Sequence, residues 1–195
     1  MRIRLKKQHK HLYPWRGWWV ALCGLVAFIT GSECGSMLWL LGIIPALALR
    51  VWARQYIGDH SRGSQFAAPE LVMAGPYAWI RHPLYVSNLL LSLSLIGFWK
   101  GFTLWAWAPA GVLVMIYVIL TMQEDAFLEQ QWGFAWQQWR QQVKGRWIPR
   151  GHARGNSPPL RTLGAAIRND LWTWVWCSAA VILLVWARNG LCSTL

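Results

Sequence analysis

The sequence predicts an all-α protein, a polytopic bundle of about five transmembrane helices with cytosolic amphipathic helices. Hydrophobic types make up 55% of its 195 residues, charged types only 13%, and the mean hydropathy is +0.27. A soluble domain usually carries about 25% charged residues, so this chain has too few to cover a soluble surface. The high apolar content also excludes a disordered chain. Many of the 17 tryptophans lie at the ends of apolar runs, as is typical of a membrane interface.

Five apolar runs are the candidate membrane helices, at residues 13–30, 37–53, 83–99, 102–122 and 171–187. A turn-rich break precedes the second run, and only Lys100-Gly101 separates the third from the fourth, which predicts two helical hairpins. We expect one membrane domain in three parts. These are an N-terminal hairpin with a cytosolic loop (1–68), a core that carries the site (69–149), and a linker with a C-terminal transmembrane helix (150–195).

The net charge of +12 is divided along the chain rather than gathered in one patch. With a cytosolic N-terminus, seventeen of the 19 lysines and arginines fall on the cytosolic side, and only Lys100 and Arg188 fall outside. This pattern favours a topology signal and excludes a nucleic-acid surface. It predicts a protein of the inner or plasma membrane, with its basic N-terminus retained as an anchor.

The four cysteines form no metal-binding pattern, because no paired C-x-x-C or Cys/His spacing is present. Cys23 and Cys177 fall within predicted membrane helices. Cys34 and Cys192 fall on the predicted outer side, where they could pair in an oxidising compartment, and the sequence leaves that pairing open.

The first unusual segment, residues 74–85, leads directly into the third apolar run. Pro83 suits the first turn of a helix, which places Arg81 and His82 at the helix N-terminus and Tyr85 one turn further on. Cationic groups beside the positive end of a helix dipole are a poor structural choice but can bind an anion. The alternative is a snorkelling arginine and an interfacial histidine with no further role.

The second unusual segment follows the fourth apolar run and contains Glu124 and Asp125. Apolar residues recur downstream at helical spacing, which predicts one apolar stripe on a continuing helix: Leu128, Trp132, Trp136, Trp139 and Val143. Glu124 lies one turn before this stripe, so we expect it to face the bundle. Carboxylates that face the interior of a membrane bundle are costly to bury, so they are candidates for functional residues. The alternative is an ordinary acidic boundary between membrane and cytosol.

The two segments are more informative together. The short turn at Lys100-Gly101 makes the third and fourth helices antiparallel neighbours and brings Arg81, His82 and Tyr85 to the same membrane face as the two acids. A combined set of cations and carboxylates can hold a zwitterion, with arginine on a carboxylate and an acid on an ammonium group or ribose hydroxyls.

The order of these motifs resembles the integral-membrane methyltransferases, which include isoprenylcysteine carboxyl methyltransferases and phospholipid methyltransferases. The resemblance rests on Gly75-Pro76-Tyr77, Arg81-His82-Pro83-x-Tyr85 and the acidic pair, followed by Leu128, Trp132-Gly133, Trp136, Trp139 and Pro149. It covers roughly residues 69–149, less than half of the chain. Asp125 stands where the family usually has glutamate, and tryptophans stand where it usually has tyrosines.

The resemblance implies an enzyme that uses S-adenosyl-L-methionine at the cytosolic face. Its acceptor would be a lipophilic membrane-dissolved small molecule or an isoprenylated or lipid substrate. The cofactor-binding residues would be Arg81, His82, Tyr85, Glu124, Gly75 and Tyr77, with Arg81 on the methionine carboxylate. His82 or Asp125 would act as a catalytic base where the acceptor needs one. No metal is implied.

Two other functions remain open at this point. One is an NADPH-dependent membrane reductase with a sterol-reductase-like architecture, and the other is a non-enzymatic membrane scaffold. The identity of the acceptor, the oligomeric state and the role of the C-terminal helix are also open.

Overall fold

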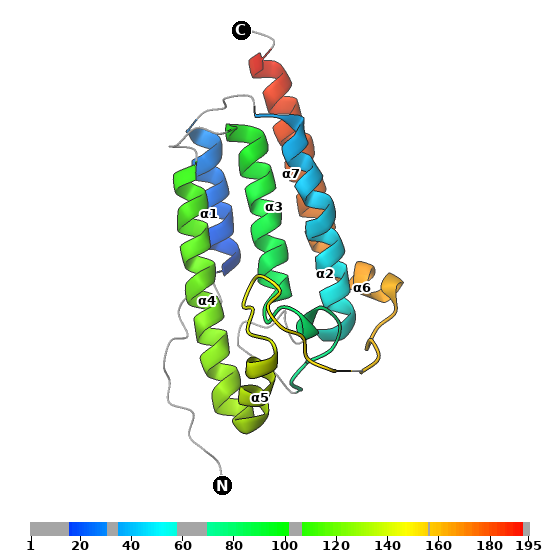
Figure 1. Ribbon diagram of the computed structural model, residues 1–195. Coiled ribbons are helices and arrows are strands. Elements are labelled where there is room, and N and C mark those ends of the chain that lie inside the picture. Colours follow the sequence, from blue (N-terminus) through cyan, green and yellow to red (C-terminus); the bar gives the residue numbers. More distant parts are fainter. Residues whose placement is uncertain (1–15, 31–34, 58–69, 102–106, 156, 193–195) are drawn as a thin grey trace.

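The computed structural model describes residues 16–30, 35–57, 70–101, 107–155 and 157–192 (Figure 1). Within these ranges every regular element is a helix, which confirms the predicted all-α class. The longer helices are α1 (Arg16–Ile29), α2 (Ile43–Ile57), α3 (Pro83–Lys100), α4 (Ala108–Trp132) and α7 (Leu171–Cys192). The shorter ones are the 3₁₀ helices η1 (Met37–Gly42) and η3 (Gly75–Ala78), α5 (Phe134–Gln142) and α6 (Leu163–Asn169).

Helix α3 lies at the centre of the bundle, packed against α2 and η1 on one side and against α1 and α4 on the other. Figure 1 shows the long helices side by side, with α5 and α6 gathered at one end. We call that end, where α3 begins, the charged end, and the end where α1, α3 and α7 finish the far end. Gly97 lets the Trp39 ring of η1 pack directly on α3, because a Cβ there would overlap the ring.

The hairpin of α3 and α4 follows the prediction in its direction but not in its bounds. Helix α3 begins at Pro83, whose fixed φ and missing N–H suit a first turn. It ends before Gly101, whose φ of 66° is readily adopted only by glycine. The described helix α4 runs from Ala108 to Trp132, ten residues beyond the predicted end at 122, and residues 102–106 lie outside the described residues. The C-terminal half of α4 therefore returns alongside the start of α3, as an antiparallel hairpin requires.

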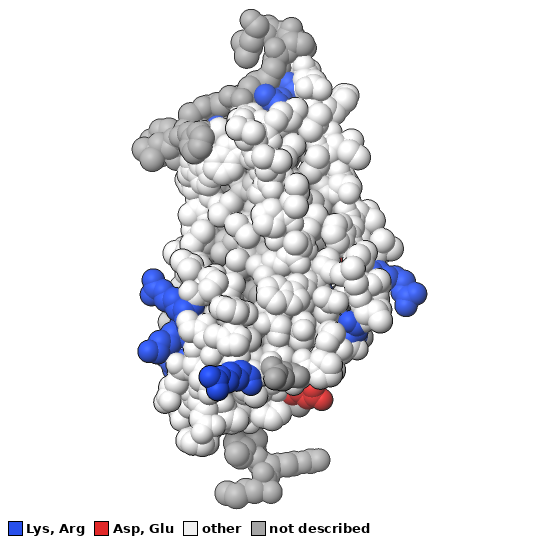
Figure 2. All heavy atoms as spheres, turned by 45° about the vertical axis from the view of Figure 1, so that its right-hand side comes forward, with Lys and Arg blue, Asp and Glu red and all other residues white. Residues whose placement is uncertain are grey.

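Three helical stretches are long and apolar enough to cross a membrane, at Met37–Ile57, Ala108–Trp132 and Leu171–Gly190, and Gly17–Ile29 is a shorter apolar helix. Most of the lysines and arginines visible in Figure 2 lie toward the charged end, and a broad uncharged band separates them from a smaller basic group at the far end. The exposed ones at the charged end include Arg140, Lys144, Arg150, Arg154 and Arg168. The fold is that of a membrane protein, and the side of the membrane that its charged end faces stays a prediction.

The predicted continuous stripe after Glu124 is wrong in one respect, because the chain breaks at Gly133. That glycine has a φ of 50°, so α4 stops at Trp132 and α5 starts in a new direction. Most of the stripe is nevertheless buried. Leu128, Trp136, Trp139 and Val143 form one core cluster with Tyr77 of η3. Because of this break, α5 is a separate short helix, and its tryptophans pack against Tyr77 and against Leu84 at the start of α3.

Two of the predicted cysteine positions can be located. Cys23 lies in a core cluster shared by α1, α3 and α4, and Cys177 is a free thiol on α7. Cys34 and the side chain of Cys192 lie outside the described residues, so their pairing stays a prediction. The division of the chain at residues 68 and 149 also stays a prediction.

Candidate functional site

A cluster of buried charges lies at the charged end, where the start of α3 meets the C-terminal half of α4. Asp125 is its centre. Arg81 Nη1 donates to Asp125 Oδ2 at 2.7 Å, and His82 Nε2 donates to Asp125 Oδ1 at 2.9 Å. Arg146 Nε donates to Oδ2 at 3.2 Å, and Glu124 Oε2 lies 3.6 Å from His82 Nδ1. We call these five residues the Asp125 cluster.

Backbone hydrogen bonds also hold two residues of the cluster in place. The N–H groups of Arg81 and His82 donate to the carbonyls of Gly145 and Arg146, at 3.0 and 3.2 Å. These bonds pin the segment before α3 to the loop that follows α5. Gly145 fits this loop because a Cβ there would overlap the carbonyl of Ile148. The site is thus assembled from three stretches of chain.

The environment of His82 favours its charged form. Burial alone lowers the pKa of this histidine, but the hydrogen bond with Asp125 and the negative charge of Glu124 outweigh it, and the pKa is raised. Burial lowers the pKa of Arg81, an effect that the charge of Asp125 opposes. The cluster therefore combines up to three positive groups with two carboxylates.

The structure confirms that the hairpin brings Arg81 and His82 to the acidic pair, but Asp125 rather than Glu124 is the more buried of the two acids. Asp125 is the buried acid at 6% exposure, whereas the side chain of Glu124 is 24% exposed. Glu124 was expected on the buried stripe, one turn before Leu128, but on the continuous helix α4 it is Asp125 that is buried together with Leu128. Arg81 pairs with Asp125 in this structure, and its predicted role in binding a ligand carboxylate stays a prediction.

Three buried polar atoms around the cluster have no hydrogen-bond partner in the described part of the chain: Arg81 Nε, Glu124 Oε2 and the Tyr77 hydroxyl. Burial raises the pKa of Tyr77, and so does the charge of Glu124, while Arg54 and Arg50 act in the opposite sense. Unsatisfied buried polar groups are rare in folded proteins and call for an explanation such as an absent ligand. These three atoms are therefore the groups at the cluster that could bind a ligand.

Two further predicted site residues have packing roles in this structure. Tyr85 lies in the core cluster between α3 and α4, with its ring edge-on to Tyr117 at 5.5 Å and to His82 at 5.8 Å. Gly75 has a φ of 61°, and a Cβ there would overlap the Tyr56 ring. Gly75 therefore allows η3 to pack closely on α2, which positions Tyr77.

A second buried charge cluster, not expected from the sequence, joins α2, α3 and the start of α7. Its acid is Asp170, which binds Arg50 Nε and lies 3.3 Å from Arg54 Nη2. Arg50 Nη1 also donates to Asn88 Oδ1 at 2.6 Å, and Nη2 donates to Thr173 Oγ1 at 3.0 Å. We call these five residues the Asp170 cluster.

Sequence reasoning missed the Asp170 cluster and Arg146 because it counted their arginines only as topology markers. A signal was present. Arg50 and Arg54 lie one turn apart at the end of an apolar helix, and Asp170 is one of only seven acids in the chain. A scarce acid directly before a membrane helix implies a cationic partner.

No group of three or more His, Cys, Asp or Glu side chains suited to a metal ion occurs among the described residues. In the Asp125 cluster both carboxylate oxygens of Asp125 already accept hydrogen bonds from cationic side chains.

Comparison with known proteins gives two curated relatives. The chain is 30% identical over 115 residues to the nickel-cobalt-cadmium resistance protein NccN of Alcaligenes xylosoxydans xylosoxydans, covering 54% of this chain and 51% of that protein. It is 32% identical over 114 residues to the cobalt-zinc-cadmium resistance protein CzcN of Cupriavidus metallidurans, covering 58% of this chain and 44% of that protein. The chain thus spans about half the length of the curated relatives it matches. No family model matches the chain, and no solved structure does either.

These relatives overturn the predicted methyltransferase. Both are named as metal-resistance proteins, so the assignment to the membrane methyltransferases, the enzyme class and the methyl-transfer function are wrong. The physical reason lies in the motif itself. The Arg-His-Pro segment and the acidic pair that carried the resemblance form an internal ion-pair cluster here. S-Adenosylmethionine as a ligand and a lipophilic partner stay predictions.

Proposed function

We propose that this protein is an integral-membrane component of resistance to divalent transition-metal ions. The observation that carries the proposal is the similarity to two proteins named for resistance to nickel, cobalt, zinc and cadmium. The helical membrane fold supports a role at the bilayer, where metal ions enter and leave a cell.

We further propose that the Asp125 cluster is the centre of this function and binds a small organic anion or zwitterion. The unpartnered Arg81 Nε offers a donor to a carboxylate. Tyr77 and Glu124 offer a hydroxyl and a carboxylate oxygen to an ammonium or hydroxyl group. A metal cation is a poorer fit, because Asp125 is engaged by Arg81, His82 and Arg146. S-Adenosylmethionine is a candidate zwitterion of this kind and a convenient probe.

Growth under metal stress tests the first proposal. The gene is deleted in the source organism and restored on a plasmid, and the minimum inhibitory concentrations of nickel, cobalt, zinc and cadmium are measured. We expect the deletion to lower the tolerated concentration of at least one of these metals several-fold and the plasmid to restore it. Unchanged tolerance of all four metals in the deletion strain would contradict the proposal.

Ligand binding tests the second proposal separately. Purified protein is titrated with S-adenosylmethionine by calorimetry, comparing Glu124→Gln with Glu129→Gln. Both substitutions neutralise a carboxylate on α4, but Glu129 bonds the exposed Gln137 side chain outside the cluster. We expect binding that Glu124→Gln weakens and Glu129→Gln leaves unchanged. Equal binding by the two variants, or no binding by wild type, would remove this ligand while leaving the metal-resistance test intact.

A further inference from the structure

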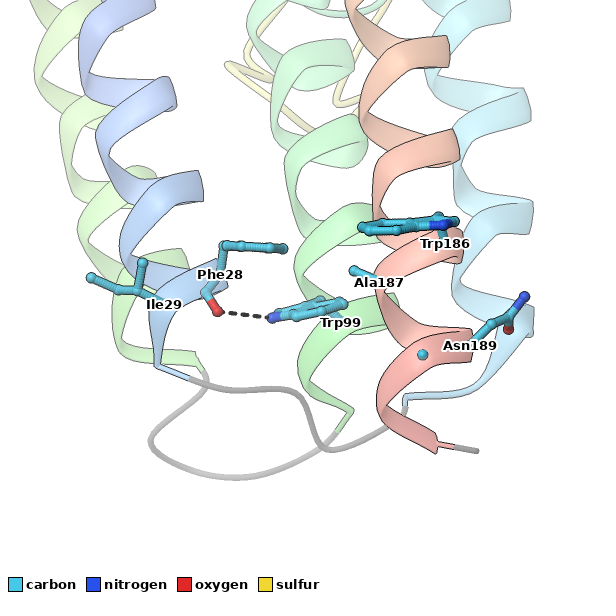
Figure 3. Close-up of a pocket in the computed structure, with 7 residues that line it drawn as sticks. Phe28, Ile29, Trp99, Trp186, Ala187 and Asn189 are labelled. Carbon is cyan, nitrogen blue, oxygen red and sulfur yellow. Dashed lines mark hydrogen bonds between the residues drawn. The ribbon is translucent and has the colours of Figure 1, made fainter. Parts of the chain in front are cut away.

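An apolar groove lies at the far end of the bundle, between the last turns of α1, α3 and α7 (Figure 3). Phe28 of α1, Trp99 of α3, and Trp186 and Ala187 of α7 line it, and its volume is 640 Å³. Small-molecule sites commonly measure about 300–1,000 Å³, so the groove is large enough to hold a ligand. It lies a full helix length from the Asp125 cluster and is a separate feature.

Two packed aromatic rings form the floor of the groove. The Phe28 and Trp99 rings stack with their centroids 4.9 Å apart, and Trp99 Nε1 donates to the Phe28 carbonyl at 3.3 Å (Figure 3). These contacts join α1 to α3 at their ends. The α7 wall is different, because Trp186 is 74% exposed. One wall is therefore fixed and packed, and the other presents a large aromatic ring outward.

The position of the groove along the helices places it near a membrane interface. Helix α3 runs from the Asp125 cluster to the groove, and its 18 residues span about 25 Å, close to the roughly 30 Å of a bilayer core. None of the apolar window of α7 is buried inside the protein, so in a membrane this helix faces lipid. Trp99 and Trp186 are of the residue type that favours the headgroup level. Acyl chains are the apolar groups available at this depth.

A positive charge lies on the turn of α7 that forms one wall of the groove, although the side chain that carries it is not part of the lining. Arg188 follows Ala187 on α7, and its guanidinium carbon lies 5.3 Å from the centroid of the Phe98 ring. Its Nε is buried and has no hydrogen-bond partner among the described residues. Helices α1, α3 and α7 contain no aspartate or glutamate. A guanidinium so placed suits a phosphate oxygen, which it can bind with two parallel hydrogen bonds.

We propose that this groove is a lipid site that takes one acyl chain of an anionic phospholipid, whose phosphate binds Arg188. The apolar lining selects the chain, and the charge at the margin selects an anionic headgroup over a zwitterionic one. The competing occupants are a zwitterionic lipid and a second copy of this chain docked against α7.

Native mass spectrometry of the full-length protein in mild detergent tests the proposal. Delipidated protein is titrated with dioleoylphosphatidylglycerol or with dioleoylphosphatidylcholine, which has the same chains. Ala187→Phe fills the groove, and Ala179→Phe, an exposed position two turns earlier on α7, is its matched control. Arg188→Gln removes the charge, and Arg168→Gln, exposed on α6, is the control for charge loss.

We expect wild type to bind one phosphatidylglycerol several-fold more tightly than phosphatidylcholine. Ala187→Phe should lose most of this binding, Arg188→Gln should bind both lipids alike, and the two controls should match wild type. Three results would overturn the proposal. They are equal binding of the two lipids by wild type, undiminished binding by Ala187→Phe, and a dimer that Ala187→Phe dissociates. Arg188→Gln keeps the test decisive if Ala187→Phe does not fold.

Discussion

The two buried charge clusters are built from the same parts but are completed to different degrees. Asp125 and Asp170 are each held by two arginines within a helical membrane fold. In the Asp170 cluster all three Arg50 nitrogens find acceptors, including Asn88 and Thr173. In the Asp125 cluster Arg81 Nε, and beside it the Tyr77 hydroxyl, have no hydrogen-bond partner in the described part of the chain. An arginine whose nitrogens all have acceptors, such as Arg50, braces helices, whereas Arg81 has a nitrogen that can bind a ligand.

The largest expected effect is on stability, and it comes from the Asp170 cluster. Asp170→Ala leaves Arg50 and Arg54 buried without their shared carboxylate, and breaking a buried ion pair costs about 3–5 kcal/mol. Asp125→Ala should cost less, because the Arg146 side chain is 34% exposed and can turn to water. Unfolding free energies measured by detergent titration check the order. A larger loss for Asp125→Ala would contradict the distinction between the clusters.

The two clusters should also differ in their pH dependence. Because the folded-state pKa of His82 is raised, its stabilisation is fully present below its unfolded pKa of about 6.5 and is lost as pH rises through the folded value. We expect the stability advantage of wild type over His82→Gln to shrink from about pH 6 to about pH 9, by roughly 1.4 kcal/mol for each unit by which the pKa is raised.

The Asp170 cluster contains no histidine, so it supplies the control for this pH series. The deficit of Asp170→Asn should stay nearly constant over the same range. An advantage over His82→Gln that grows with pH would show that His82 is neutral in the folded protein.

The smallest expected changes in unfolding free energy differ in sign between the Asp170 cluster and Tyr77, which lies beside the Asp125 cluster. Thr173→Val removes an acceptor from Arg50 and should lower the unfolding free energy by about 1 kcal/mol. Tyr77→Phe removes a buried hydroxyl that has no partner in the described chain, so it should leave stability unchanged or raise it by up to about 1 kcal/mol. A pair of thermal unfolding curves distinguishes them. A clear loss in Tyr77→Phe would mean that its hydroxyl is already satisfied.

The helical class could be predicted from the sequence. The proximity of Arg81 and His82 to the acidic pair could also be predicted, because the turn at Lys100-Gly101 dictates an antiparallel hairpin. The sequence was not sufficient to say which acid faces inward. Glu124 and Asp125 are adjacent on one continuous helix, and the burial of Asp125 comes from long-range contacts with Arg81, His82 and Arg146. The pairing of Arg50 with Asp170 spans 120 positions, and no local pattern encodes it.

The functional prediction failed for a related reason. Short motifs of arginine, histidine and acids are compatible both with a cofactor site and with an internal ion-pair cluster, and their spacing alone does not separate the two. Arg81 is compatible with both, since its Nη1 donates to Asp125 at 2.7 Å while its Nε has no hydrogen-bond partner among the described residues.

The central claim is that the Asp125 cluster serves metal resistance by binding a ligand, and Tyr77→Phe tests it most directly because this substitution should not destabilise the fold. The measurement is the minimum inhibitory concentration of cobalt and cadmium for the deletion strain carrying wild type or Tyr77→Phe at matched membrane levels. We predict that wild type restores tolerance and that Tyr77→Phe restores it only in part. Full restoration by Tyr77→Phe, together with full restoration by Glu124→Gln, would contradict the claim.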